Sequence, residues 1–133
     1  MSDTHILVVD DEPEIRQLFV DILAPQGYQV TAVGSGPEAI ARAREMVGAG
    51  KDAAPVVVFL DIKMPGMNGA EAFTALRQLL PRAHYVMITG YAGSELVDES
   101  LAGGALLCLN KPFGVADVLD LVGSLAGHAA SRA

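Results

Sequence analysis

Four short apolar runs constrain the fold of this chain more than any other feature of its sequence. Each run has the length and composition of a buried β-strand, and each closes on a polar residue. If these strands are parallel neighbours, the polar residues meet at one edge of one sheet, where open α/β sheets bind ligands. The runs and the polar residues that end them are 6–9 with Asp10 and Asp11, 56–60 with Asp61, 86–88 with Thr89, and 105–109 with Lys111.

Strand-like and helix-like patterns alternate five times along the chain, which indicates a mostly parallel α/β sheet with flanking helices. Apolar residues at intervals of three and four predict the helices, and short apolar runs predict the strands. The segment from Ala92 to Leu101 has few and small apolar positions, so its helical pattern is the least regular. The predicted strands are 4–9, 28–33, 56–60, 84–88 and 105–109, and the predicted helices start near residues 13, 36, 69, 92 and 115.

Two of the predicted helices carry capping signals at their start. Ser35 with Glu38, and Asn68 with Glu71, match the spacing of a capping box. Pro13 stands just after Asp10-Asp11-Glu12, where the first turn of a helix tolerates proline. These signals place helix starts directly after strand ends, as a βα unit requires.

Length and composition indicate one domain and exclude several classes of protein. We expect a domain over residues 1–127 and a flexible tail over 128–133, and the Met1 start favours a stand-alone protein. A net charge of -7 with scattered basic residues argues against direct nucleic-acid binding. The apolar stretches are too short to span a membrane and no export signal is present. A single cysteine, Cys108, fits a reducing, cytoplasmic setting.

The polar strand ends match the chemistry of a divalent cation and a phosphoryl group. Two carboxylates about 4 Å apart repel by roughly 4 kcal/mol at an effective dielectric near 20, so a cluster needs a counter-charge. Lys111 offers one positive charge and Mg²⁺ offers the rest, since this ion takes one or two carboxylates, waters and a phosphate oxygen. An aspartate such as Asp61 can itself be the nucleophile, and the hydroxyl of Thr89 can donate to a phosphoryl oxygen.

Structural explanations compete with this interpretation at each position. Asp10 and Asp11 are favourable before a helix start, although three acidic residues in a row exceed what capping requires. Asp61 could bond turn amides. Thr89 fits an ordinary strand residue, and a lysine in a loop is usually solvated, although Pro112 and Phe113 fix the backbone beside Lys111. Cys108 is most simply a buried small hydrophobe.

The pattern resembles the receiver domain of two-component response regulators over about residues 4–125. The residues that carry the resemblance are 7–12, 61–69, 88–91 and 110–113, each at a strand end and in the same order. The resemblance implies a flavodoxin-like, doubly wound sheet of five parallel strands in the order 2-1-3-4-5 with five helices. It also implies a sensor histidine kinase or histidine phosphotransfer protein as phosphodonor, and a downstream protein of unknown identity.

By this resemblance, Asp61 is the phosphoacceptor and lies at a Mg²⁺ site, with Mn²⁺ as an alternative ion. Asp11 is the main side-chain ligand and Asp10 supports the ion through water. The third protein ligand is the backbone carbonyl of Lys63. Reaction at this site is limited to the protein's own phosphorylation and dephosphorylation, and whether the chain forms a homodimer is left open.

The same resemblance assigns the switch residues. Thr89 and Lys111 match the hydroxyl and lysine that respond to the phosphoryl group, and Lys63 and Tyr91 lie where the family tunes phosphate lifetime. Cys108 is a departure, because the family usually has Tyr or Phe at this position. The reacting groups are all present, so we expect phosphorylation to persist, and whether the signal leaves through the usual face of helix four, strand five and helix five is left open.

Three other functions fit parts of the pattern. A Mg²⁺-dependent phosphatase with an aspartate nucleophile typically has a second aspartate where this chain has Lys63. A flavin-binding electron carrier needs a hydroxyl- and glycine-rich loop where this chain has three acidic residues, which would repel a flavin phosphate. A receiver-like interaction module without phosphorylation is the third alternative, and it leaves the complete set of reacting groups unused.

Overall fold

The computed structural model describes residues 4–50, 53–90 and 95–130, the last four of these for the backbone only. Strands and helices alternate throughout, as the sequence predicts, with one short 3₁₀ turn after the first helix. The elements are β1 (His5–Val9), α1 (Pro13–Leu23), η1 (Ala24–Gln26), β2 (Gln29–Val33), α2 (Gly36–Ala49), β3 (Val57–Asp61), α3 (Gly69–Leu79), β4 (His84–Thr89), α4 (Glu95–Ala102), β5 (Leu107–Asn110) and α5 (Val115–Ala130).

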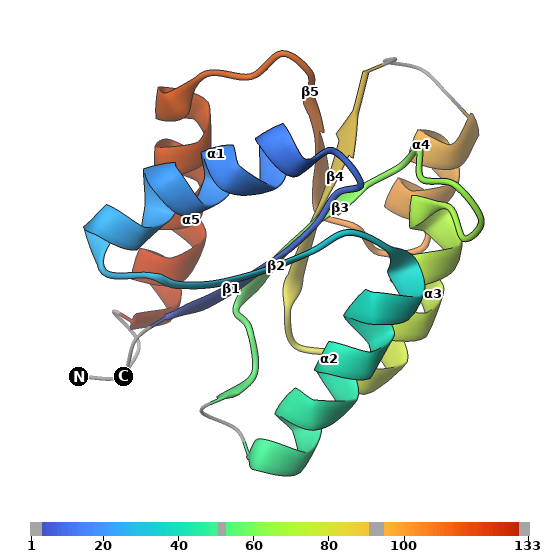
Figure 1. Ribbon diagram of the computed structural model, residues 1–133, viewed down its shortest axis with the longest axis horizontal. Helices are drawn as coiled ribbons and strands as arrows, with labels where there is room; N and C mark the ends of the chain where they lie inside the picture. Colours follow the sequence, from blue (N-terminus) through green and yellow to red (C-terminus); the bar gives the residue numbers. More distant parts are fainter. Residues whose placement is uncertain (1–3, 51–52, 91–94, 131–133) are drawn as a thin grey trace.

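The five strands form one parallel sheet in the order β2-β1-β3-β4-β5, which confirms the predicted fold class and strand order. The order reverses between β1 and β3, the two central strands (Figure 1). Val9 pairs with Leu60 in the register of these two strands, so both end at the same level. This is the position at which open α/β sheets bind ligands.

Helices cover both faces of the sheet, with α1 and α5 on one face and α2, α3 and α4 on the other (Figure 1). Successive residues of a strand point to opposite faces, so the strands supply two separate cores. Ile6, Val8 and Phe59 pack toward α1 and α5. Leu7 and Leu60 pack toward the three other helices. Burial on both faces explains why residues 6–9 of β1 and 57–60 of β3 are all apolar.

The capping predictions are confirmed at α3 and half confirmed at α2. Asn68 Oδ1 accepts a hydrogen bond from the Glu71 amide at 2.9 Å, and Glu71 Oε1 accepts one from the Asn68 amide at 3.0 Å. Ser35 Oγ accepts from the Glu38 amide at 3.2 Å. The Glu38 carboxylate accepts from the amide of Gly34 rather than from that of Ser35, so this box is shifted by one residue.

The structure differs from the sequence prediction toward the C-terminus. Helix α5 continues to Ala130, where alanines favour a helix, and the flexibility of residues 128–133 stays a prediction. Cys108 is half-buried rather than buried, since β5 is the last strand of the sheet. The irregular helix is present as α4, which spans Glu95–Ala102 within the described residues. None of the helices in the described ranges combines the length and apolar content that a membrane crossing needs.

Candidate functional site

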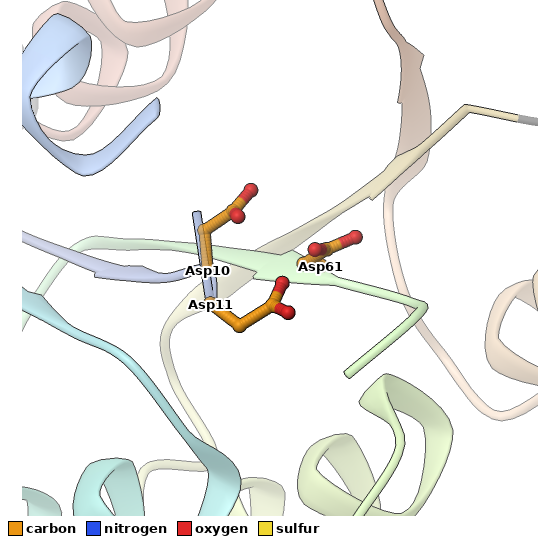
Figure 2. Close-up of side chains that lie close together, drawn as sticks. All are labelled: Asp10, Asp11 and Asp61. Atoms are coloured by element: carbon orange, nitrogen blue, oxygen red, sulfur yellow. The ribbon is translucent and has the colours of Figure 1, made fainter. Parts of the chain in front are cut away.

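Three carboxylates lie together at the carboxyl ends of the central strands. Asp10 and Asp11 follow β1, and Asp61 is the last residue of β3 (Figure 2). Each offers one oxygen, and these oxygens all lie within 4.8 Å of one another. The structure therefore brings together the three acidic residues that the sequence assigned to one site. Oxygen donors at this separation suit a hard divalent cation.

Asp10 is a buried carboxylate with one unsatisfied oxygen. Its Oδ1 accepts a hydrogen bond from the Glu12 amide at 2.9 Å. Its Oδ2 is the single buried side-chain polar atom without a hydrogen-bond partner in the described parts of the chain, although Lys111 Nζ lies 3.2 Å away. Burial raises the pKa of the Asp10 carboxyl, and the Glu12 amide and the Lys111 charge offset only part of that rise.

Asp61 is held between a turn amide and an ammonium group. Its Oδ1 accepts a hydrogen bond from the Lys63 amide at 3.3 Å, and its Oδ2 accepts one from Lys111 Nζ at 3.5 Å. Burial, and then the nearby charge of Asp10, raise the pKa of Asp61 to about 7, against the opposing effect of Lys111. A carboxylate with a raised pKa is a better base and nucleophile than an ordinary aspartate, and it is ionised above neutrality.

Lys111 is the cation of the site and contacts three carboxylates. Its Nζ lies 3.0 Å from Glu12, 3.2 Å from Asp10 and 3.5 Å from Asp61. Burial lowers the pKa of Lys111, but the hydrogen bond to Glu12 and the charges of Asp10 and Asp61 outweigh this, so its pKa is raised. The Lys111 amide donates to the Thr89 carbonyl at 2.7 Å, which fixes the end of β5 beside the end of β4.

The structure gives fewer contacts for the other residues that the sequence assigned to the site. Thr89 is the buried last residue of β4 and pairs with Asn110 in the sheet register. Lys63 is exposed, and beyond its amide contact with Asp61 the metal role of its carbonyl stays a prediction. Tyr91 lies outside the described residues. Cys108 packs against the core on the α2, α3 and α4 face, and burial raises the pKa of its thiol.

Sequence reasoning did not assign the roles of three residues that support the site. Glu12 binds Lys111 through its side chain. Arg16 Nη1 donates to the Asp10 carbonyl at 2.8 Å and so ties α1 to the end of β1. Gly69 lies against the backbone of Asp61, where a Cβ atom would collide with the Asp61 carbonyl oxygen. A glycine at the start of an otherwise regular helix was the available signal for this close approach.

The model of the response regulator receiver domain matches residues 6–123. The chain belongs to this family. The match runs from β1 into α5 and includes the strand ends that carry the three carboxylates, Thr89 and Lys111. The chain is therefore a receiver module of two-component signalling, the phosphoacceptor part of such systems.

Relatives of this receiver domain include proteins of similar and of much greater length. Sporulation initiation phosphotransferase F of Bacillus subtilis is 30% identical over 122 residues, which are 92% of this chain and 93% of the relative. The regulatory protein AtoC of Escherichia coli is 33% identical over 118 residues, which are 89% of this chain and 24% of AtoC. The same module is thus similar to nearly whole proteins and to parts of larger regulators.

Solved structures of receiver domains share the fold. A CheY-like receiver domain protein of Methanospirillum hungatei has a TM-score of 0.85 at 28% identity, covering 99% of this chain and 100% of that one. A chain of the CheX–CheY complex of Borrelia burgdorferi with BeF₃ and Mg²⁺ has a TM-score of 0.79 at 26% identity, covering 91% of this chain and 87% of that one. Both likenesses extend over nearly the entire receiver domain.

Proposed function

We propose that Asp61 of this receiver domain accepts a phosphoryl group from a phosphohistidine on a sensor kinase or phosphotransfer protein. The observation that carries the proposal is the placement of one buried carboxylate with a raised pKa beside both a lysine ammonium and two further carboxylates. The buried carboxylate is the nucleophile. The ammonium neutralises charge on the incoming group, and the two further carboxylates suit a cation.

The transfer is a displacement at phosphorus. A carboxylate oxygen of Asp61 forms a P–O bond while the P–N bond of the donor breaks. The imidazole nitrogen leaves with the electron pair and takes a proton from solvent. The product is an acyl phosphate on Asp61, and attack by water on phosphorus returns the free carboxylate and inorganic phosphate. With acetyl phosphate as donor the same attack breaks its P–O bond and releases acetate.

The residues at the strand ends fit a divalent cation. The site holds four carboxylates, including that of Glu12, and one ammonium, so it carries excess negative charge. Asp10 Oδ2 is buried and makes no hydrogen bond, although Lys111 Nζ is ion-paired with it at 3.2 Å, which fits an oxygen that serves a cation directly or through water. Asp10, Asp11, Asp61 and the Lys63 carbonyl would hold Mg²⁺ or Mn²⁺. When bound, the ion neutralises charge on the phosphoryl oxygens.

Thr89 and Lys111 respond to the new group on Asp61. A phosphoryl group adds about -1.5 to -2 charge at pH 7 and three strong acceptor oxygens. Lys111 Nζ already contacts Asp61 at 3.5 Å and can donate to one of these oxygens. Thr89, at the end of the adjacent strand β4, can donate its hydroxyl to another. Movement of these two side chains carries the signal to the loops that follow β3 and β4.

The partners follow from this chemistry. The donor is a protein phosphohistidine, and the phosphorylated surface is read by a downstream protein. The Borrelia burgdorferi CheX–CheY complex, which contains BeF₃ and Mg²⁺, supports the combination of cation, bound group and protein partner. The net charge of -7 agrees with a module that acts on proteins rather than directly on nucleic acid.

The proposal is tested by incubating the protein with acetyl phosphate and Mg²⁺ and measuring its intact mass. We expect the mass of one phosphoryl group to be added to the parent and to Asp120→Asn, whose aspartate is exposed on α5. Asp61→Asn should take up none, and chelation of Mg²⁺ should abolish uptake by the parent. Equal labelling of Asp61→Asn and the parent would overturn the assignment.

A further inference from the structure

Glu12 directly follows the two aspartates, and its side chain does something other than cap the helix that starts there. It is the N-cap residue of α1, yet its side chain makes no capping hydrogen bond. Its carboxylate instead accepts a hydrogen bond from Lys111 Nζ at 3.0 Å, across 99 positions of the sequence. Ser, Thr, Asp and Asn are the residues preferred at this position. A local capping role therefore does not account for glutamate here.

The three carboxylates around Lys111 differ in how well they tolerate its departure. Glu12 is the nearest, at 3.0 Å, and its side chain is 56% exposed. Asp10 and Asp61 lie at 3.2 and 3.5 Å, and their side chains are 0% and 4% exposed. A buried carboxylate that loses its counter-charge stays desolvated, whereas water can solvate Glu12. Glu12 is thus the partner that Lys111 gives up at the lowest cost.

We propose that Glu12 is a positioning residue that holds Lys111 in the unphosphorylated protein and releases it to a phosphoryl oxygen on Asp61. This inference rests on the proposed function of Asp61. An ammonium group has three N–H donors, and in this site they face three carboxylates. Its Nζ is hydrogen-bonded to Glu12 and Asp61 and ion-paired with Asp10, so a phosphoryl oxygen on Asp61 competes with Glu12 for the ammonium. Weakening the Glu12–Lys111 contact should make phosphorylation easier.

The test compares two variants of Glu12 with a matched control. An exposed ion pair typically changes an equilibrium by a factor of about 2 to 5, so we expect Glu12→Gln to raise the rate constant for phosphorylation by acetyl phosphate about two- to five-fold. Glu12→Asp keeps the charge but is one methylene shorter, and we expect it to raise the rate as well. Glu14→Gln, the control, removes an equal charge from an exposed residue of α1 and should leave the rate unchanged.

A second readout reports on Lys111 itself rather than on phosphorylation. In the unphosphorylated protein, Glu12→Gln should shift the ¹⁵Nζ resonance of Lys111, because the nearest acceptor of the ammonium changes from a charged carboxylate to a neutral amide oxygen. Glu14→Gln should leave this resonance in place. Thermal unfolding of each variant, measured in parallel, shows whether Glu12→Asp has strengthened the cap of α1. A stronger cap is expected only in Glu12→Asp, so it cannot explain a shifted Lys111 resonance in Glu12→Gln.

The possible results separate this inference from the assignment of Asp61. Faster labelling of both Glu12 variants, with a shifted Lys111 resonance in Glu12→Gln, supports the positioning role. Faster labelling of Glu12→Gln alone means that charge repulsion of the donor is the cause, and the positioning role is wrong. Equal rates in all variants, or an unmoved resonance, also overturn it while the labelled parent preserves the role of Asp61. If the parent protein takes up no label, both the positioning role of Glu12 and the assignment of Asp61 are wrong.

Discussion

The central strands β1 and β3 differ between their middles and their carboxyl ends. In the middle, Leu7, Val8, Phe59 and Leu60 are completely buried and surrounded by apolar side chains. At the ends, the same two strands lead into Asp10 and reach Asp61, carboxyl groups whose pKa values are raised by burial. Burial stabilises the folded state in the middle of the sheet. At the carboxyl end, burial of the carboxylates destabilises it.

The strand middles supply most of the stability of the sheet, and the strand ends carry its reactive groups. Full burial of a large apolar side chain contributes about 1.5–3 kcal/mol, so a few residues in the strand middles offset a strained arrangement of charges. The rigid strands hold carboxylates close together that would separate on a flexible chain. We therefore expect substitutions in the middle to lower the stability, and some substitutions at the end to raise it.

The largest loss of stability is expected from Phe59→Ala in the middle of β3. Phe59 is fully buried, and its ring centroid lies 4.6 Å from that of Phe19. Loss of a buried aromatic ring from a core costs about 3–5 kcal/mol. Urea unfolding should show this loss, while Val115→Ala, at a position that is 52% exposed, should change the stability far less. A loss below about 1 kcal/mol would contradict the tight packing of this strand.

Gly69→Ala should disturb the end of β3, where the buried middle of the strand meets the carboxylate site. A Cβ atom at this position would collide with the Asp61 carbonyl oxygen and lie 2.7 Å from Ile62 Cα, and backbone atoms cannot rotate away. We expect a destabilisation of about 1–3 kcal/mol and slower phosphorylation, because the end of β3 must shift. Gly123→Ala is the control, since no atom lies within 4 Å of its Cβ position on α5. Alanine there should stabilise the helix by up to about 1 kcal/mol.

Asp61→Asn should raise the stability at high pH when Mg²⁺ is absent. The folded protein binds the Asp61 proton more tightly than the unfolded chain, because the pKa rises from 3.8 to about 7. The parent therefore loses stability as pH rises from 3.8 through 7, and asparagine avoids this loss. We expect a gain of about 1–2 kcal/mol at pH 8 that declines as the pH falls toward 4.

The control for the Asp61 prediction is the cation itself. At pH 8, Mg²⁺ should raise the thermal unfolding temperature of the parent more than that of Asp61→Asn, because the ion supplies the counter-charge that the variant no longer needs. A variant that is less stable than the parent at pH 8 would show that the carboxylate is not strained by its surroundings.

The smallest effect is expected at the cap of α3. Asn68→Ala removes the side-chain half of the capping box and should cost about 1 kcal/mol. Because α3 follows the turn after Asp61, the loss should be confined to stability and leave the labelled mass unchanged. Thermal unfolding combined with intact mass distinguishes this outcome from a change in the site.

Much of the fold could be predicted because its signals are local. The apolar runs of β1 and β3, the proline at the start of α1 and the box formed by Asn68 and Glu71 each depend on a few neighbouring residues. Parallel strands then bring their ends to one edge, so the sequence alone predicts that Asp10, Asp11 and Asp61 lie together. The strand order followed from the family resemblance.

The features that could not be predicted depend on contacts between distant parts of the chain. Nothing near Glu12 in the sequence indicates that its carboxylate binds Lys111. The half-burial of Cys108 depends on β5 having a neighbour on one side only. The collision that excludes a side chain at Gly69 depends on how closely α3 approaches the end of β3. Each is a matter of tertiary packing, which sequence periodicity does not report.

Localising the phosphoryl group within the chain is the most direct test of the central claim. After labelling with acetyl phosphate and Mg²⁺, borohydride reduces an acyl phosphate to an alcohol, so a phosphorylated aspartate becomes homoserine. Peptide mass spectrometry should then find homoserine at position 61 and aspartate unchanged at positions 10 and 11. Homoserine at position 10 or 11 with aspartate retained at 61, or a phosphoryl group that resists borohydride, would contradict the account.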